Sequence, residues 1–197
     1  MKTKKNKRIE KYYEEVFDFI KESKNYIYFS VLIFLIFSFI GFFFPIPDSL
    51  RAVIINFIEE LLSKTQDMSH GGLIWFILLN NIQSSFFGMI YGILFGIFPI
   101  FASLANGYLL GFVASEAVKS NGISVLWRLF PHGILELPAL FISLGLGIKL
   151  GSFVFGKSKL KTLKIYFIKS VKTFLLVVVP LLILAAIIEG SLIFLFS

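Results

Sequence analysis

Residues 131–139 read Pro-His-Gly-Ile-Leu-Glu-Leu-Pro-Ala and open an apolar run, 131–150, that is long enough to cross a bilayer. The run places His132 and Glu136 four residues apart, between two prolines. Ionisable groups at membrane depth are costly, and they usually mark a functional site or a tightly paired structural one. This stretch therefore indicates a membrane-embedded chain and provides its first candidate site.

The composition of the whole chain agrees with a membrane protein. Of its 197 residues, 57% are hydrophobic and only 16% are charged, and the mean hydropathy is +0.86. Soluble domains usually carry about 25% charged residues. We therefore predict an all-α, polytopic helical membrane protein with about five transmembrane segments. The expected spans are 26–44, 72–97, 99–118, 131–150 and 171–196.

The remaining parts of the chain are expected to lie at the membrane surface. Residues 1–25 read as a basic cytoplasmic segment with an amphipathic helix at 8–24, and residues 26–197 as a single helical membrane domain. Residues 48–63 and 122–130 have the pattern of further amphipathic helices that lie in the interface. The fourth span is expected either to cross the membrane as a broken helix or to form a re-entrant hairpin.

The basic residues fall into two clusters. Of 19 Lys and Arg residues, eight precede residue 25 and seven lie between residues 149 and 172. With five crossings both clusters face the cytoplasm, so the positive-inside rule predicts a cytoplasmic N-terminus and an outside C-terminus in the cell membrane. The expected partner of these clusters is the anionic lipid surface, and no nucleic-acid partner is expected.

Six polar side chains inside the expected spans form a predicted polar network, because lipid cannot satisfy their hydrogen bonds. They are Asn80, Asn81, Asn106, His132, Glu136 and Glu189. Consecutive residues point about 100° apart on a helix, so at least one of Asn80 and Asn81 should face the bundle interior. Asn106 is either the partner of this pair or a point where the third span unwinds. Glu189 is expected at a depth similar to that of His132 and Glu136, or else extends to the outer interface.

Two prolines frame the candidate site. Pro131 suits a first helical turn, whereas Pro138 removes a backbone hydrogen bond and should kink the helix near Glu136. Three interpretations stay open: a buried polar latch, a proton or cation pathway, and a metal site. The metal site is the weakest of the three, because two ligands are too few to hold an ion. We expect no metal and no cofactor.

Glycines recur every four residues in the second and third spans. Such spacing lines one helix face and lets two helices approach backbone to backbone. We predict that these glycines pack the second span against the third, with a homodimer face as the alternative. The residues are Gly88, Gly92, Gly96, Gly107 and Gly111.

The motifs of serine hydrolases and zinc proteases do not appear in the sequence. There is no GxSxG and no HExxH pattern, and the chain has no cysteine for thiol chemistry. We therefore predict a protein that is not an enzyme.

Four motifs in order carry a resemblance to a known family: Asn80-Asn81, Asn106-Gly107, residues 131–139, and Ala185 to Glu189. Their order and spacing, from about residue 30 to 195, resemble the stage II sporulation protein M family. The resemblance implies an integral membrane protein of about five helical spans. In endospore-forming bacteria the namesake works in engulfment, in a complex with a peptidoglycan-degrading amidase and a lytic transglycosylase, where it is the multispan member and not the hydrolase.

Two functions therefore remain as expectations. The first is a non-enzymatic scaffold or anchor for a membrane or cell-envelope protein, stabilised by the buried polar network. The alternative is a transporter or channel for protons, cations or a small solute that uses His132, Glu136 and Glu189.

Overall fold

A computed structural model describes residues 4–44 and 46–196, without the side chains of residues 4–9, 62, 127–132 and 196. No strand occurs in this described part, which confirms the all-α prediction. The α-helices are α1 Lys4–Phe43, α2 Asp48–Thr65, α3 His70–Ile90, α4 Ile97–Asn121, α5 Phe130–Gly151, α6 Lys159–Thr173 and α7 Val179–Phe196. Shorter helical turns connect them: η1 Tyr91–Ile93, η2 Ile123–Leu129, η3 Ser152–Phe155 and the π-helical η4 Phe174–Val178.

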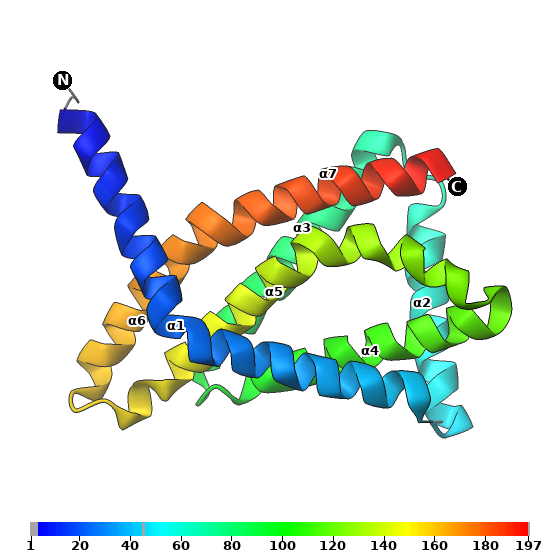
Figure 1. Ribbon diagram of the computed structural model, residues 1–197, viewed down its shortest axis with the longest axis horizontal. Helices are drawn as coiled ribbons and strands as arrows, with labels where there is room; N and C mark the ends of the chain where they lie inside the picture. Colours follow the sequence, from blue (N-terminus) through cyan, green and yellow to red (C-terminus); the bar gives the residue numbers. More distant parts are fainter. Residues whose placement is uncertain (1–3, 45, 197) are drawn as a thin grey trace.

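In the described part of the chain, five helical stretches are long and apolar enough to cross a membrane, as the sequence predicts. They are Glu10–Phe43, His70–Ile93, Ile97–Asn121, Gly133–Phe155 and Lys159–Leu195. The N- and C-termini lie at opposite ends of the bundle that these helices form (Figure 1). An odd number of crossings requires this arrangement.

The helix α1 is longer than the predicted first span. It runs from Lys4 to Phe43 without a break at residue 25, so the amphipathic segment 8–24 and the span 26–44 form one helix. Residues 4–40 contain neither proline nor glycine, and therefore nothing in the backbone interrupts the helix. The first half of α1 buries Val16 and Phe19, each 1% exposed, and it contacts α6.

The second basic cluster, which lies between the predicted fourth and fifth spans, is largely helical. A short turn after η3 leads into α6, and α6 continues through the π-turn η4 into α7. Pro180 lies directly after the π-turn within this continuous helix, so its missing N–H interrupts the helical hydrogen bonding there. The helix that contains the last span therefore begins well before the predicted residue 171.

The helix α5 forms the centre of the bundle. It contacts α1, α3, α4, α6 and α7, and 56% of its apolar stretch is buried, compared with 17% for that of α1. Pro138 lies inside α5, and the helix continues past it, although α5 follows a curved path in Figure 1. The fourth segment is therefore a bent helix that passes from one end of the bundle to the other, and not a re-entrant hairpin.

The helix α2 crosses one end of the bundle, next to the end of α1 (Figure 1). Its Arg51 forms an ion pair with Glu116 of α4, and Lys119 lies 2.8 Å from the other carboxylate oxygen of Glu116. The Arg51–Glu116 pair attaches this exposed amphipathic helix to the spans, at the end where α3 begins and α7 ends.

Candidate functional site

The two predicted acidic residues lie toward the same end of the interface between α5 and α7. Ala139 and Leu182 belong to one buried cluster, and the two helices run in opposite directions (Figure 1). Along α5, Glu136 precedes Ala139 by three residues, about 4.5 Å, and along α7, Glu189 follows Leu182 by seven residues, about 10.5 Å. These spacings place each glutamate on the same helix face as its core residue. The fold therefore directs both carboxylates toward one region, as the five-span topology predicts.

Both carboxylates are partly withdrawn from the surface. Glu136 and Glu189 are half-buried, and the Oε2 atom of each is fully buried. His132 lies in the first turns of α5, one turn before Glu136, but its side chain lies outside the described residues, as does that of Pro131. The described geometry thus supplies two acidic groups at one end of the α5–α7 interface.

A histidine that the sequence analysis missed lies at this end of the bundle. His70 begins α3, and its Nε2 atom is 3.0 Å from the hydroxyl of Ser191 on α7. Its ring stacks on Phe194 with the ring centroids 4.9 Å apart. These contacts fasten the start of α3 to the end of α7, two residues beyond Glu189. Only tertiary structure could reveal them, because 121 residues separate the partners.

The asparagines do not form the predicted interhelical pair. The Asn106 amide donates to the carbonyl of Ala102 in its own helix at 2.8 Å, and α4 stays helical through Asn106 and Gly107. The prediction that Asn106 partners Asn80 and Asn81, or unwinds the third span, is therefore wrong. Asn81 is half-buried, whereas Asn80 is exposed on α3.

The glycines lie at close helix contacts, but with partners other than the predicted ones. A Cβ on Gly92 would collide with the carbonyl oxygen of Gly147, and one on Gly88 would lie 2.7 Å from Leu144 Cδ2, so this stripe packs on α5. A Cβ on Gly107 or Gly111 would collide with the backbone of α1, at Phe34 or Ser38. The prediction that the second and third spans pack on each other through these glycines is wrong, because each stripe faces a different helix.

Gly96 has a second role besides packing. Its φ of +73° reverses the chain between η1 and α4, and a Cβ there would lie 3.3 Å from the carbonyl oxygen of Ile148. Glycine adopts this backbone conformation at no steric cost. The turn at Gly96 therefore also packs against α5.

A charged cluster at the opposite end of the bundle was not foreseen in the sequence. Lys149 of α5 has a side chain only 5% exposed, and its Nζ atom lies 3.4 Å from Glu22 Oε2 and 4.2 Å above the ring of Phe19. Lys169 lies 3.8 Å from the same carboxylate. Glu15 on the same helix also pairs with Lys172, at 2.6 Å. The sequence signal for this cluster was the helical spacing of Glu15, Phe19 and Glu22, which places all three side chains on one face.

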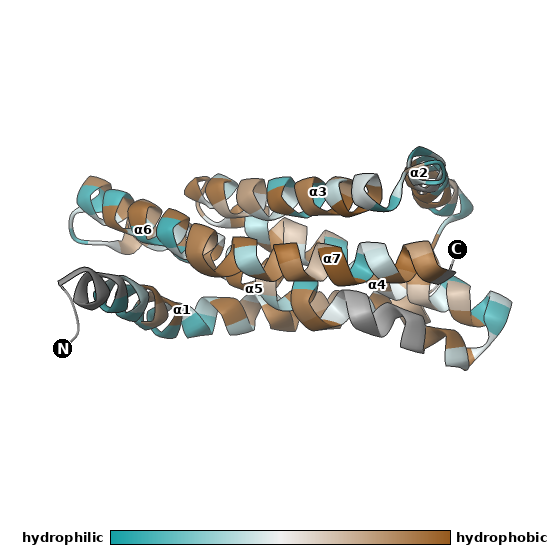
Figure 2. Cartoon of the chain, turned by 90° about the horizontal axis from the view of Figure 1, so that it is seen from above, coloured by the Kyte–Doolittle hydropathy of each residue, from teal (hydrophilic) through white to brown (hydrophobic). Residues whose placement is uncertain are grey.

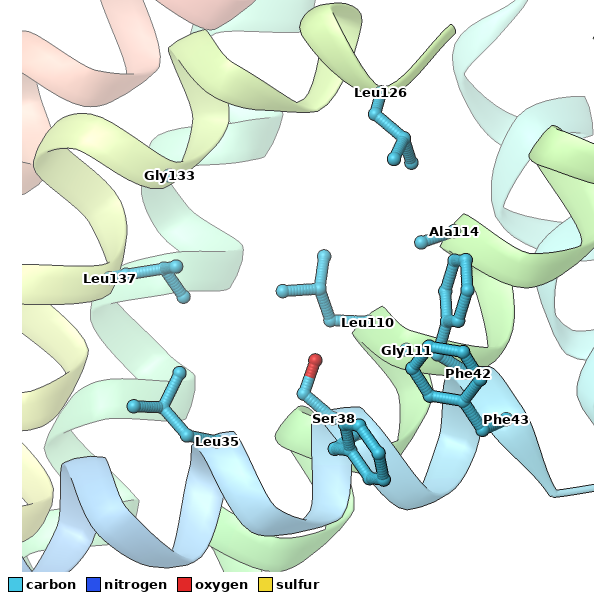
Figure 3. A pocket seen from close by; sticks show the side chains of 11 residues that line it. Leu35, Ser38, Phe42, Phe43, Leu110, Gly111, Ala114, Leu126, Gly133 and Leu137 are labelled. Carbon is cyan, nitrogen blue, oxygen red and sulfur yellow. The ribbon is translucent and has the colours of Figure 1, made fainter. Parts of the chain in front are cut away.

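An apolar cavity of about 370 Å³ opens between α1, α4 and α5 (Figure 3). Among the described residues that line it, Ser38 has the one polar side chain. Gly133 and Leu137, which flank Glu136 in the sequence, belong to that lining. The other lining residues are Leu35, Phe39, Phe42, Phe43, Leu110, Gly111, Ala114 and Leu126.

Comparison with known proteins places these features in a family. The family model described as stage II sporulation protein M matches residues 30–192, most of the chain. The chain belongs to the stage II sporulation protein M family. Its resemblance to that family, inferred from four motifs, is confirmed. An uncharacterized protein of Methanocaldococcus jannaschii is 29% identical over 170 residues, which cover 83% of this chain and 75% of the relative. No solved structure matches the chain.

The family region and the charged cluster overlap only in part. Asn80, Asn106, Glu136 and Glu189 fall within residues 30–192 of this stage II sporulation protein M family member. Glu15 and Glu22 precede that region, whereas Lys149 and Lys172 fall inside it. The first half of α1 is therefore attached to the family core by ion pairs whose acidic partners come from outside the matched region.

Proposed function

We propose that this protein is a non-enzymatic membrane scaffold that anchors a partner protein of the membrane or cell envelope. The observation that carries the proposal is the backbone-to-backbone packing around α5. Gly92 and Gly147 leave no side chain between η1 and α5, and a Cβ on Gly145 would lie 2.6 Å from Ile27 Cα on α1. Helices locked at this distance favour one rigid arrangement.

In this proposal the acidic residues act as a latch. Glu136 and Glu189 lie toward one end of the α5–α7 interface, with one oxygen of each carboxylate buried. His70 and Ser191 fasten α3 to α7 at this end. Polar groups that are withdrawn from lipid and held between helices fix the register of a bundle.

The second candidate is a pathway for protons or cations, and the two half-buried carboxylates favour it. A pathway needs a polar route to them. The described cavity that borders the same stretch of α5 is lined by ten apolar residues and Ser38. That lining favours the scaffold.

Orientation and lipid contacts form part of the proposal. The basic end of the bundle contains Lys157, Lys159 and Lys161 beside two strongly exposed apolar side chains, Phe155 (89%) and Leu160 (80%). Lysines next to exposed apolar side chains suit an anionic membrane surface. We therefore place this end, with the N-terminus, in the cytoplasm and the C-terminus outside.

A flux assay separates the two candidate functions. The purified protein and Glu136→Gln would be reconstituted in liposomes under a proton or potassium gradient, with protein-free liposomes as the control. The scaffold proposal expects all three preparations to leak equally. A flux that depends on Glu136 would overturn the scaffold and establish the pathway.

A photo-crosslinking experiment then tests the anchoring role itself. Photoreactive residues placed singly at exposed positions in cells should give an adduct of one discrete mass from one face of the bundle. Lipid-facing positions such as Leu32 serve as controls. Adducts at no position, or equally at every position, would count against an anchored partner.

A further inference from the structure

The helix α3 exposes a polar stripe on the outside of the bundle. Asn80, Gln83 and Ser84 are all exposed, and so are Phe87 and Tyr91 (48% and 43%). Spacings of three, four and seven residues place these side chains on one helical face. Figure 2 shows α3 at an edge of the bundle, with hydrophilic residues within an otherwise apolar helix.

The stripe lies at the depth where exposure to lipid is most costly. The span that contains α3 runs from His70 to Ile93, 24 residues, so Asn80 to Ser84 occupy its middle. In the described part of the chain, none of these three side chains hydrogen-bonds to another residue. Hydrocarbon supplies neither donors nor acceptors for amides, and polar residues within membrane spans ordinarily face protein or water.

The glycine face of α3 is already used within the molecule. Gly88 and Gly92 are buried against α5, so the glycine-mediated homodimer considered from the sequence has no free surface on this helix. The stripe at Asn80, Gln83 and Ser84 is a different, exposed face of the same helix, and no described residue forms a hydrogen bond with these side chains.

We propose that this stripe binds the same stripe of a second copy of the chain, forming a two-fold dimer in the membrane. Two copies inserted with the same orientation are related by an axis along the membrane normal, so each residue meets its own copy at the same depth. Asn and Gln side chains both donate and accept hydrogen bonds, and the stripe carries no charge. The surface is therefore complementary to itself, whereas a different protein would need matching polar groups at this depth.

Single-cysteine cross-linking tests the dimer directly, because the natural chain has no cysteine. Gln83→Cys and Ser84→Cys would be compared in lipid bilayers with Leu184→Cys, a matched control on α7 that is 52% exposed. The proposal expects a cross-linked product of twice the chain mass from the two α3 variants, and little from the control. Equal yields at all three positions would overturn it, and so would an adduct of another mass at the α3 positions in native membranes.

Removing the polar groups tests the chemistry of the contact. Asn80→Leu combined with Gln83→Leu should raise the dimer dissociation constant in vesicles by about ten- to a hundredfold, through loss of several interhelical hydrogen bonds. Gln83→Asn, which keeps an amide, should retain most of the affinity. Both changes lie on an exposed face, so the monomer should still fold, which a thermal melt in detergent checks. An unchanged dissociation constant would refute the proposal, whether or not the scaffold function holds.

Discussion

Gly92 and Gly147 meet backbone to backbone, and a Cβ on Gly92 would collide with the carbonyl oxygen of Gly147. The contact joins the second span to α5, the central helix of the bundle. It explains why glycine recurs in both helices: even a methyl group would push the two backbones apart.

Gly92→Ala is expected to lower the free energy of unfolding by about 1–3 kcal/mol, the usual range for an overpacked core. The obstruction is a backbone, which cannot move aside as a side-chain tip can. Thermal or SDS-induced unfolding in detergent would measure the loss. The matched control is Gly71→Ala, where nothing lies within 4 Å of the added Cβ. Equal stability of the two variants would contradict the packing described here.

Ser143→Ala is expected to destabilise the bundle by about 0.6–1.7 kcal/mol, the measured range for interhelical hydrogen bonds in membranes. The buried hydroxyl of Ser143 donates to the carbonyl of Ser85 on α3 at 2.6 Å. Ser103→Ala is the control, since the buried hydroxyl of Ser103 donates to Pro99 in its own helix. An effect of Ser103→Ala as large as that of Ser143→Ala would argue against an interhelical role for Ser143.

Lys149 and Glu22 should be energetically coupled. A double-mutant cycle with Lys149→Met and Glu22→Gln is expected to give a coupling of about 1 kcal/mol, because solvent screens the half-exposed carboxylate of Glu22. Unfolding in detergent at low salt provides the four free energies. Asp18→Asn serves as the control for a carboxylate on the same helix, since among the described residues Asp18 pairs only with the exposed Lys21. A coupling within error of zero would mean that the pair does not hold α1 against α5.

Arg51→Gln should free α2 from the bundle with little loss of overall stability. The Arg51 side chain is 46% exposed, so its pair with Glu116 contributes at most about 1 kcal/mol. Hydrogen exchange followed by mass spectrometry should show faster exchange in α2 and unchanged exchange in α4. The control is Lys64→Gln, which removes an ion pair within α2. Identical exchange in both variants would show that Arg51 does not hold α2 in place.

The sequence correctly predicted an all-helical membrane protein and the approximate positions of its five apolar spans. Runs such as 72–97 and 131–150 are long and apolar, and a bilayer accepts such runs only as helices. The motifs around Asn80, Asn106 and Pro131–Ala139 indicated the family, and the family model confirms it. The helix boundaries were less accurate, because the segment 8–24 is amphipathic in pattern yet continuous with the following span.

The partners of the candidate residues could not be predicted in the same way. Gly88, Gly92 and Gly96 indicated close packing, but helical spacing gives only the face of a helix and not the neighbour that occupies it. Asn106 appeared available for Asn80 or Asn81, yet its own helix offers the Ala102 carbonyl at 2.8 Å. A local bond of this kind needs no second helix and competes with any interhelical one.

By itself, the sequence determined an all-helical membrane protein with five spans, because hydrophobic length and backbone hydrogen bonding are local properties of the chain. The tertiary structure alone decided that α5 is central, that Gly92 meets Gly147, that Lys149 is buried beside Glu22, and that Asn80 and Gln83 face outward. These outcomes depend on how whole helix surfaces fit together. Lipid is as apolar as most of those surfaces, so the side-chain pattern of one helix does not specify its neighbour.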